Sequence, residues 1–150
     1  MERQTIEEQV RQFCDAWQDL NLIYEAYARS INVPYTSLYI LSMITQNENC
    51  TQKTICEKTL LPRQTVNTVI TGFYRKKWIT LEEMPEDRRI KTIHLTKEGK
   101  KFTDQMIPQI QKAELQAMET LSPEQRETLL KGIRTYRDAF ETAMSSIPKK

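Results

Sequence analysis

The spacing of apolar residues predicts a mainly helical chain with one pair of short strands. Apolar residues in segment 63–77 recur at i, i+3, i+4 and i+7, the spacing of one helix face. They are Val66, Val69, Ile70 and Phe73. Segments 79–83 and 91–95 alternate apolar and polar residues, which predicts two half-buried strands joined by a polar loop. With a shorter helix over 51–59 and a turn at Leu60-Leu61-Pro62, this order predicts a winged helix-turn-helix.

Long apolar stripes flank this module on both sides. Residues 5–30 and 35–45 are expected to form helices separated by Asn32-Val33-Pro34, and Thr96 is expected to cap a helix that continues to Leu121. Pro108 lies inside that helix, so we expect a kink there or a break just before it. Ser122-Pro123-Glu124-Gln125 has the pattern of a capping box and predicts the start of the last helix.

The terminal helices carry more apolar length than one small module can cover. We therefore expect residues 1–34 and 97–150 to form the interface between two copies of the chain. Residues 35–96 are expected to form the winged helix-turn-helix, or reading module, of the same single domain. The fold class is mainly α with a small β-hairpin wing.

The face of the 63–77 helix opposite its apolar stripe is rich in hydroxyl and amide groups. It carries Gln64, Thr68, Thr71 and Arg75, flanked by Thr65 and Asn67. Such groups can donate to and accept from base edges and phosphates. An ordinary amphipathic helix is the alternative interpretation.

The loop between the strands places Arg88 and Arg89 beside Asp87. Guanidinium groups on a protruding loop suit the narrow, electronegative minor groove of DNA. Asp87 would then orient an arginine without touching DNA itself. A solvated turn with a surface ion pair is the alternative.

Charge is distributed unevenly, although the net charge is only +2. Residues 51–101 hold 12 Lys and Arg against 6 Asp and Glu, while the rest of the chain holds 10 against 14. A basic module on an acidic body is typical of a protein with one surface facing phosphates.

Other classes of protein have little support in this sequence. There is no run of about 18 apolar residues and no signal-peptide pattern at Met1, so we expect a cytoplasmic protein without a membrane segment. Three cysteines without metal-ligand spacing indicate reduced thiols. With one histidine and no nucleophile or phosphate-binding motif, we expect neither an enzyme nor a cofactor or metal site.

The segment from Thr51 to Gly99, with Asp87-Arg88-Arg89 and the closing Leu95-Thr96-Lys97-Glu98-Gly99, resembles the multiple antibiotic resistance regulator (MarR) family of dimeric winged-helix transcription factors. The resemblance implies that two recognition helices of a homodimer read successive major grooves of a pseudo-palindromic operator, usually in a repressor. It assigns base recognition to Gln64, Thr65, Asn67 and Thr68, and minor-groove contact to Arg89 supported by Asp87. Phosphate contacts are expected from Arg63, Arg75 and Lys91. Trp78 departs from the family, where a glycine usually precedes the first wing strand, so that turn is expected to be less sharp.

The resemblance also implies a pocket for a small phenolic or lipophilic effector near the dimer helices. The aromatic residues around the first two helices are candidates for its lining, with one methionine: Trp17, Tyr24, Tyr35, Tyr39 and Met43. They could equally be core and interface residues. Cys14 is a candidate redox sensor, because one branch of the family oxidises a first-helix cysteine held by two tyrosines, although a thiol on the buried stripe would resist oxidation. A winged-helix module that binds protein and not DNA is the remaining alternative.

Overall fold

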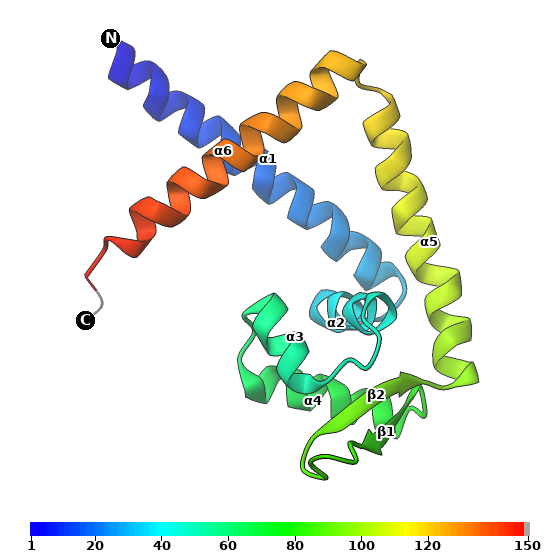
Figure 1. Cartoon of the computed structure of the whole chain (residues 1–150). Helices are drawn as coiled ribbons and strands as arrows, with labels where there is room; N and C mark the ends of the chain where they lie inside the picture. The colour runs from blue at the N-terminus through cyan, green and yellow to red at the C-terminus, as the bar shows by residue number, and fades with distance from the viewer. Residues whose placement is uncertain (149–150) are drawn as a thin grey trace. The chain divides into compact units, whose positions relative to one another are not determined.

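Six helices and one two-stranded antiparallel hairpin make up residues 1–148, which the computed structural model describes (Figure 1). The elements are α1 (Glu2–Ser30), α2 (Tyr35–Gln46), α3 (Gln52–Thr59), α4 (Arg63–Arg75), β1 (Ile79–Glu83), β2 (Lys91–Leu95), α5 (Lys97–Glu119) and α6 (Pro123–Ser145). The predicted winged helix-turn-helix is confirmed, and both strands have the predicted bounds. The chain divides into two compact units, with the boundary between residues 104 and 105.

The apolar face of α4 is buried in the centre of the first unit. Val66, Ile70 and Phe73 are between 0% and 3% exposed, as the spacing of the stripe predicts. Their neighbours in the core come from α2, α3 and both strands: Ile40, Leu41, Ile44, Ile55, Ile79 and Ile93. Each such side chain contributes roughly 1.5–3 kcal/mol when it is fully buried. The rotation of α4 about its own axis is therefore fixed by the core.

The hairpin is held to the helix-turn-helix at its second strand. Leu81 pairs with Ile93 in the antiparallel register, and the amide of Ile93 donates to the carbonyl of Cys50 at 2.7 Å. Thr51 forms an isolated bridge with Thr92, which buries Thr92 and breaks the alternation expected along this strand. Thr51, the residue just before α3, thus joins the edge of the wing through one isolated bridge.

The end of α4 differs from the prediction in its position and its geometry. The helix stops at Arg75, two residues early, because Lys77 adopts a left-handed φ of 60°. The amide of Trp78 donates to Phe73 O at 3.0 Å and that of Lys77 to Tyr74 O at 3.0 Å, the two bonds of a Schellman motif. The turn is therefore tight, contrary to our expectation for a chain with Trp78 at this position, because Lys77 supplies the left-handed residue.

The start of α5 packs directly on the backbone of this turn. The Thr96 hydroxyl donates to Lys77 O at 2.6 Å and accepts from the amide of Gly99 at 3.1 Å, which confirms Thr96 as the cap. A Cβ atom on Gly99 would lie 2.0 Å from the carbonyl oxygen of Trp78. The Trp78 ring stacks on Phe102, with centroids 4.3 Å apart. The glycine that closes the Leu-Thr-x-x-Gly pattern is thus explained by close approach of two backbones.

The chain from residue 105 on contains the rest of α5 and all of α6. Ser122 and Gln125 form the predicted capping box, in which the Ser122 amide donates to Gln125 Oε1 at 2.8 Å and the Gln125 amide donates to Ser122 Oγ at 3.2 Å. Of the kink or break expected at Pro108, the break does not occur, because α5 runs without interruption through this residue. The proline removes a single N–H bond, and the neighbouring turns keep the helix continuous.

Replacing Gly99 with alanine is expected to destabilise the protein by about 1–3 kcal/mol, because the new methyl group would overlap the Trp78 backbone. Gly72→Ala is the matched control, since a Cβ atom there meets no atom within 4 Å and alanine favours the helix by about 0.5–1 kcal/mol. Denaturant unfolding of both variants measures the difference. Equal stability of Gly99→Ala and the original protein would contradict the close approach.

Candidate nucleic-acid interface

The outward face of α4 presents the polar side chains that the sequence placed there. Gln64, Asn67, Thr68 and Arg75 are exposed, whereas Thr65 and Thr71 are half-buried. The Thr68 hydroxyl donates to Gln64 O at 2.9 Å, so its oxygen is available as an acceptor. The face therefore offers amides, a hydroxyl and a guanidinium side by side.

The start of α4 is open toward solvent. Pro62 occupies the N-cap position, and Arg63 begins the helix in an exposed position. Within residues 1–148 no side chain caps this end. The free backbone amides of the first turn, with the positive helix end, suit an anion such as a phosphate.

The flanks of this face differ from each other. Thr65 and Thr68 border a surface groove between α4 and the start of α2, which also contains Val33, Val69 and Phe73. On the other flank the side-chain amide of Gln52 donates to Asn67 Oδ1 at 3.4 Å. Gln52 belongs to no motif in the sequence, although its place three residues before the apolar Ile55 puts it on the side of α3 that meets α4.

The wing loop holds Arg89 in a defined direction. Its Nε lies 3.1 Å and its Nη2 3.2 Å from the two carboxylate oxygens of Asp87, and its amide donates to Asp87 Oδ1 at 3.0 Å. The Arg89 side chain is nonetheless 91% exposed. The side-chain hydrogen bond from Arg89, and then the backbone one, lower the pKa of Asp87. Asp87 thus orients an arginine that stays available to a partner, and Arg88 and Lys91 are exposed beside it.

The helix face and the wing belong to the same unit. Figure 1 shows α4 and the hairpin side by side, and Phe73, Ile79 and Ile93 share one core. All ten predicted DNA-binding residues lie on α4 or on the loop and second strand of the wing.

Three of the five predicted effector-pocket residues form a stacked row where α1 meets α2. Tyr24 and Tyr35 stack with centroids 5.9 Å apart, and Tyr35 and Tyr39 do so at 6.4 Å. Trp17 stacks instead on Phe13 and is exposed, and it lies about 10 Å along α1 from Tyr24. Met43 packs against the core.

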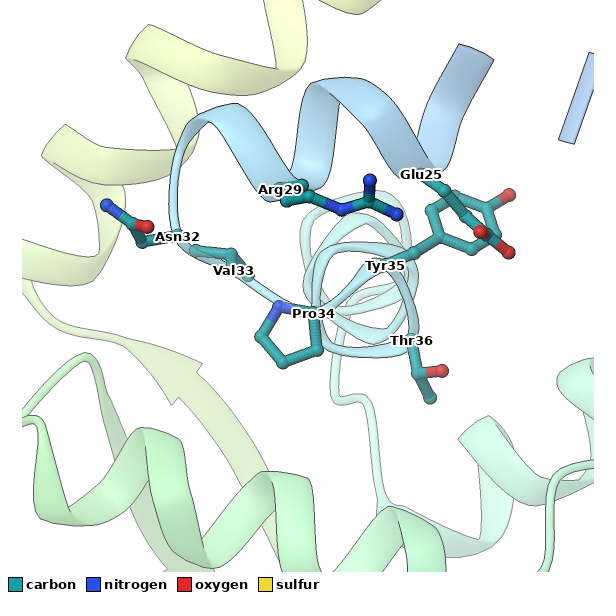
Figure 2. A pocket seen from close by; sticks show the side chains of 7 residues that line it. All are labelled: Glu25, Arg29, Asn32, Val33, Pro34, Tyr35 and Thr36. Carbon is teal, nitrogen blue, oxygen red and sulfur yellow. The ribbon is translucent and has the colours of Figure 1, made fainter. Parts of the chain in front are cut away.

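A hollow does occur where α1 joins α2, with a lining more polar than predicted. It is lined by Glu25, Arg29, Asn32, Val33, Pro34, Tyr35 and Thr36 (Figure 2). Of the predicted residues only Tyr35 takes part. Figure 2 shows the Arg29 guanidinium on the same side of the hollow as Glu25 and Tyr35. The aromatic signal in the sequence located this region but not the charged residues, which lie one helical turn apart on α1.

Cys14 is exposed, not buried on the α1 stripe as expected. Ten residues separate it from Tyr24, about 15 Å of helix, so its sulfur does not lie between the two stacked tyrosines. Cys50 is buried, which raises the pKa of its thiol. All three cysteines are free. No group of three metal-ligating side chains and no helix able to span a membrane occurs in the described part of the chain.

The Arg89→Ala variant should raise the pKa of Asp87 toward its ordinary value, but only in part, because the backbone amide of residue 89 still donates. Since the pKa of Asp87 is lowered in the folded protein, the contact is complete above the ordinary carboxyl pKa. It is lost as the pH falls through the lowered value. NMR titration of the Asp87 carboxyl carbon in both proteins measures this. An unchanged pKa would show that Arg89 does not orient on Asp87.

Comparison with known proteins shows which folds this geometry resembles. Residues 31–90 match the profile of the MarR family, and no curated protein gave a significant match to the sequence. The fold is similar to that of a MarR/EmrR family transcriptional regulator from Acinetobacter sp. ADP1 (TM-score 0.72, 20% identity, covering 91% of this chain and 96% of that chain). It is also similar to Streptococcus pneumoniae FabT in complex with DNA (0.77, 17%, 91% and 98%). A third similar structure is Staphylococcus aureus MarR in complex with salicylate and kanamycin (0.72, 19%, 94% and 93%). The chain thus has the winged-helix fold of the MarR family, and residues 31–90 carry the sequence match to that family.

Proposed function

We propose that this protein is a sequence-specific DNA-binding transcription regulator that acts as a repressor. The observation that carries the proposal is the exposed amide and hydroxyl face of α4 beside the oriented Arg89 of the wing. The similar FabT structure contains DNA, which supports this choice of partner over a protein. Catalysis has no comparable support among the described side chains.

Each part of the surface has a separate role in this proposal. Gln64, Thr65, Asn67 and Thr68 read base edges in the major groove, where amides and hydroxyls can discriminate among base pairs. Arg63, Arg75, Arg88 and Lys91 contact phosphates and fix the register of the protein on the duplex. Arg89 enters the minor groove, and Asp87 holds its direction.

We further infer that two copies bind one pseudo-palindromic operator. On α1 the exposed apolar side chains are Ile6, Val10, Trp17, Leu20, Leu22 and Ile23; on α6 they are Leu129, Leu130, Tyr136, Phe140 and Met144. So many exposed apolar groups on two helices are expected at a protein interface. A two-fold dimer would offer two copies of α4 to successive major grooves about 34 Å apart.

A small effector would release the operator by changing the separation of the two reading modules, since both half-sites must be engaged together for tight binding. The hollow between α1 and α2 lies at the link between a proposed dimer helix and the reading module. The salicylate complex of the similar S. aureus protein supports an effector of small size. We do not assign a redox role to Cys14, which lies about 15 Å along α1 from Tyr24.

Arg89→Ala should weaken binding to the selected operator by about 1–3 kcal/mol, or roughly 5- to 100-fold at fixed salt, because it removes the proposed minor-groove contact. Operator fragments come from selection of bound duplexes from a genomic library, and affinity is measured by fluorescence anisotropy. Arg3→Ala is the control, since this arginine pairs with Glu7 at the far end of the long α1 helix and is 93% exposed. Equal losses of operator affinity in both variants would show that Arg89 contributes only its positive charge. Selection that enriches no sequence would instead favour a module that binds protein.

Sedimentation velocity should show a dimer, and Phe140→Asp on α6 should shift it toward monomer, because a carboxylate is costly to bury in an apolar interface. Leu60→Asp is the matched control: Leu60 is also apolar and exposed, but it lies in the turn between α3 and α4. A monomeric original protein, or identical behaviour of the two variants, would contradict the proposed dimer.

A further inference from the structure

We propose that Gln52 is a positioning residue that decides which bases Asn67 can recognise. The inference rests on the proposed DNA-binding function and deepens it, since neither the wing nor the outward face of α4 includes Gln52. The proposal starts from the hydrogen bond between the side-chain amides of these two residues, in which Gln52 Nε2 donates to Asn67 Oδ1 at 3.4 Å.

The two residues face each other because their helices pack through a shared core. Gln52 lies one turn before Ile55 on α3, and Asn67 lies one turn before Ile70 on α4. Ile55 is 0% exposed and Ile70 is 1% exposed, and both belong to the same cluster. The pair therefore lies at the solvent edge of the contact between the two helices, with Gln52 half-buried and Asn67 exposed.

Two contacts made by the preceding residue, Thr51, hold the backbone at Gln52 in place. Thr51 caps α3 by accepting the amide of Thr54 at 3.1 Å, and it bridges to Thr92 on the wing. Gln52 is the first residue of α3, so its Cα is fixed by both the cap and the bridge. A side chain on such an anchored backbone can orient a neighbour at a lower entropic cost than one on a mobile loop.

This contact sets the polarity of the Asn67 amide. An amide group is planar, with its oxygen and nitrogen on separate branches, so an oxygen turned toward α3 leaves the nitrogen directed outward. The outward branch then carries N–H donors. In the major groove they match the acceptors of guanine (N7 and O6), thymine (O4) and adenine (N7), whereas cytosine presents only its N4 donor and is disfavoured.

Gln52→Glu tests this with an almost isosteric change. A carboxylate at residue 52 accepts but does not donate, so Asn67 must turn its nitrogen toward α3 and present its oxygen to DNA. At the base position that Asn67 contacts, guanine and thymine, which present acceptors only, should become disfavoured, whereas cytosine and adenine, which present an N–H donor, should become preferred. The ratio of affinities for operators that differ only at this position should change by about tenfold or more. Gln52→Met, which has no hydrogen-bonding partner for Asn67, should relax the preference without reversing it.

Lys53→Gln is the matched control for charge. It makes the same change of one negative unit at the adjacent residue, whose ammonium group pairs with Glu57 at 3.8 Å and not with Asn67. It should weaken binding to all operators alike through lost phosphate attraction and leave the base preference unchanged. Selection from a randomised duplex pool is run with the full-length original protein and all three variants, and thermal unfolding checks that each is folded.

The outcomes separate this proposal from the function on which it rests. If the original protein enriches no sequence, the proposed function fails. If it enriches a site and the folded Gln52→Glu variant enriches the same bases at every position, Gln52 does not position Asn67 and the inference is overturned. A change of preference at one position in each half-site, absent in Lys53→Gln, would support it.

Discussion

The burial of one face of α4 is the constraint on which the candidate site depends. Val66, Ile70 and Phe73 lie in a core built from α2, α3 and both strands. Turning the helix by one residue, about 100°, would bring these side chains toward water and cost several kcal/mol. The opposite face is therefore held outward without any interaction of its own. Gln64 and Thr68 are not needed to fill the core, because other residues of α4 do so. Their side chains can therefore serve binding alone.

The same core fixes the wing relative to α4. Ile79 and Ile93 are buried with Phe73, and Trp78 stacks on Phe102 while its carbonyl accepts the amide of Thr96. Because Gly99 lets the start of α5 approach that carbonyl, the strand and the helix leave the turn without a flexible linker. A helix face and an arginine at separate points of one rigid unit can contact two grooves of a duplex at once, which a mobile loop would do only at an entropic cost.

The long helices α1 and α6, unlike α4, bury almost none of their apolar residues within the chain. Only Ala28 of α1 is buried in the chain, and no residue of α6 is, although both helices carry regular apolar stripes. In our proposal a second copy covers these faces, so DNA binding depends on an interface outside the reading module. The hollow lined by Arg29 and Tyr35 lies where α1 continues into α2. In our proposal, a ligand bound in this hollow changes the angle between α1 and the reading module without contacting α4.

The sequence by itself determined the elements and the outward face of α4, because periodicity of 3.6 or 2 residues specifies which side chains a buried surface removes from water. It likewise placed Arg89 beside Asp87 and the caps at Thr96 and Ser122, since these contacts join residues two or three apart. The packing of the elements was needed to show the pairing of Gln52 with Asn67, the bridge that buries Thr92, the approach that requires Gly99, and the charged residues Glu25 and Arg29 in the hollow beside Tyr35. These contacts join residues on different elements. Their distances depend on how the elements pack in three dimensions, which local spacing along the chain does not encode.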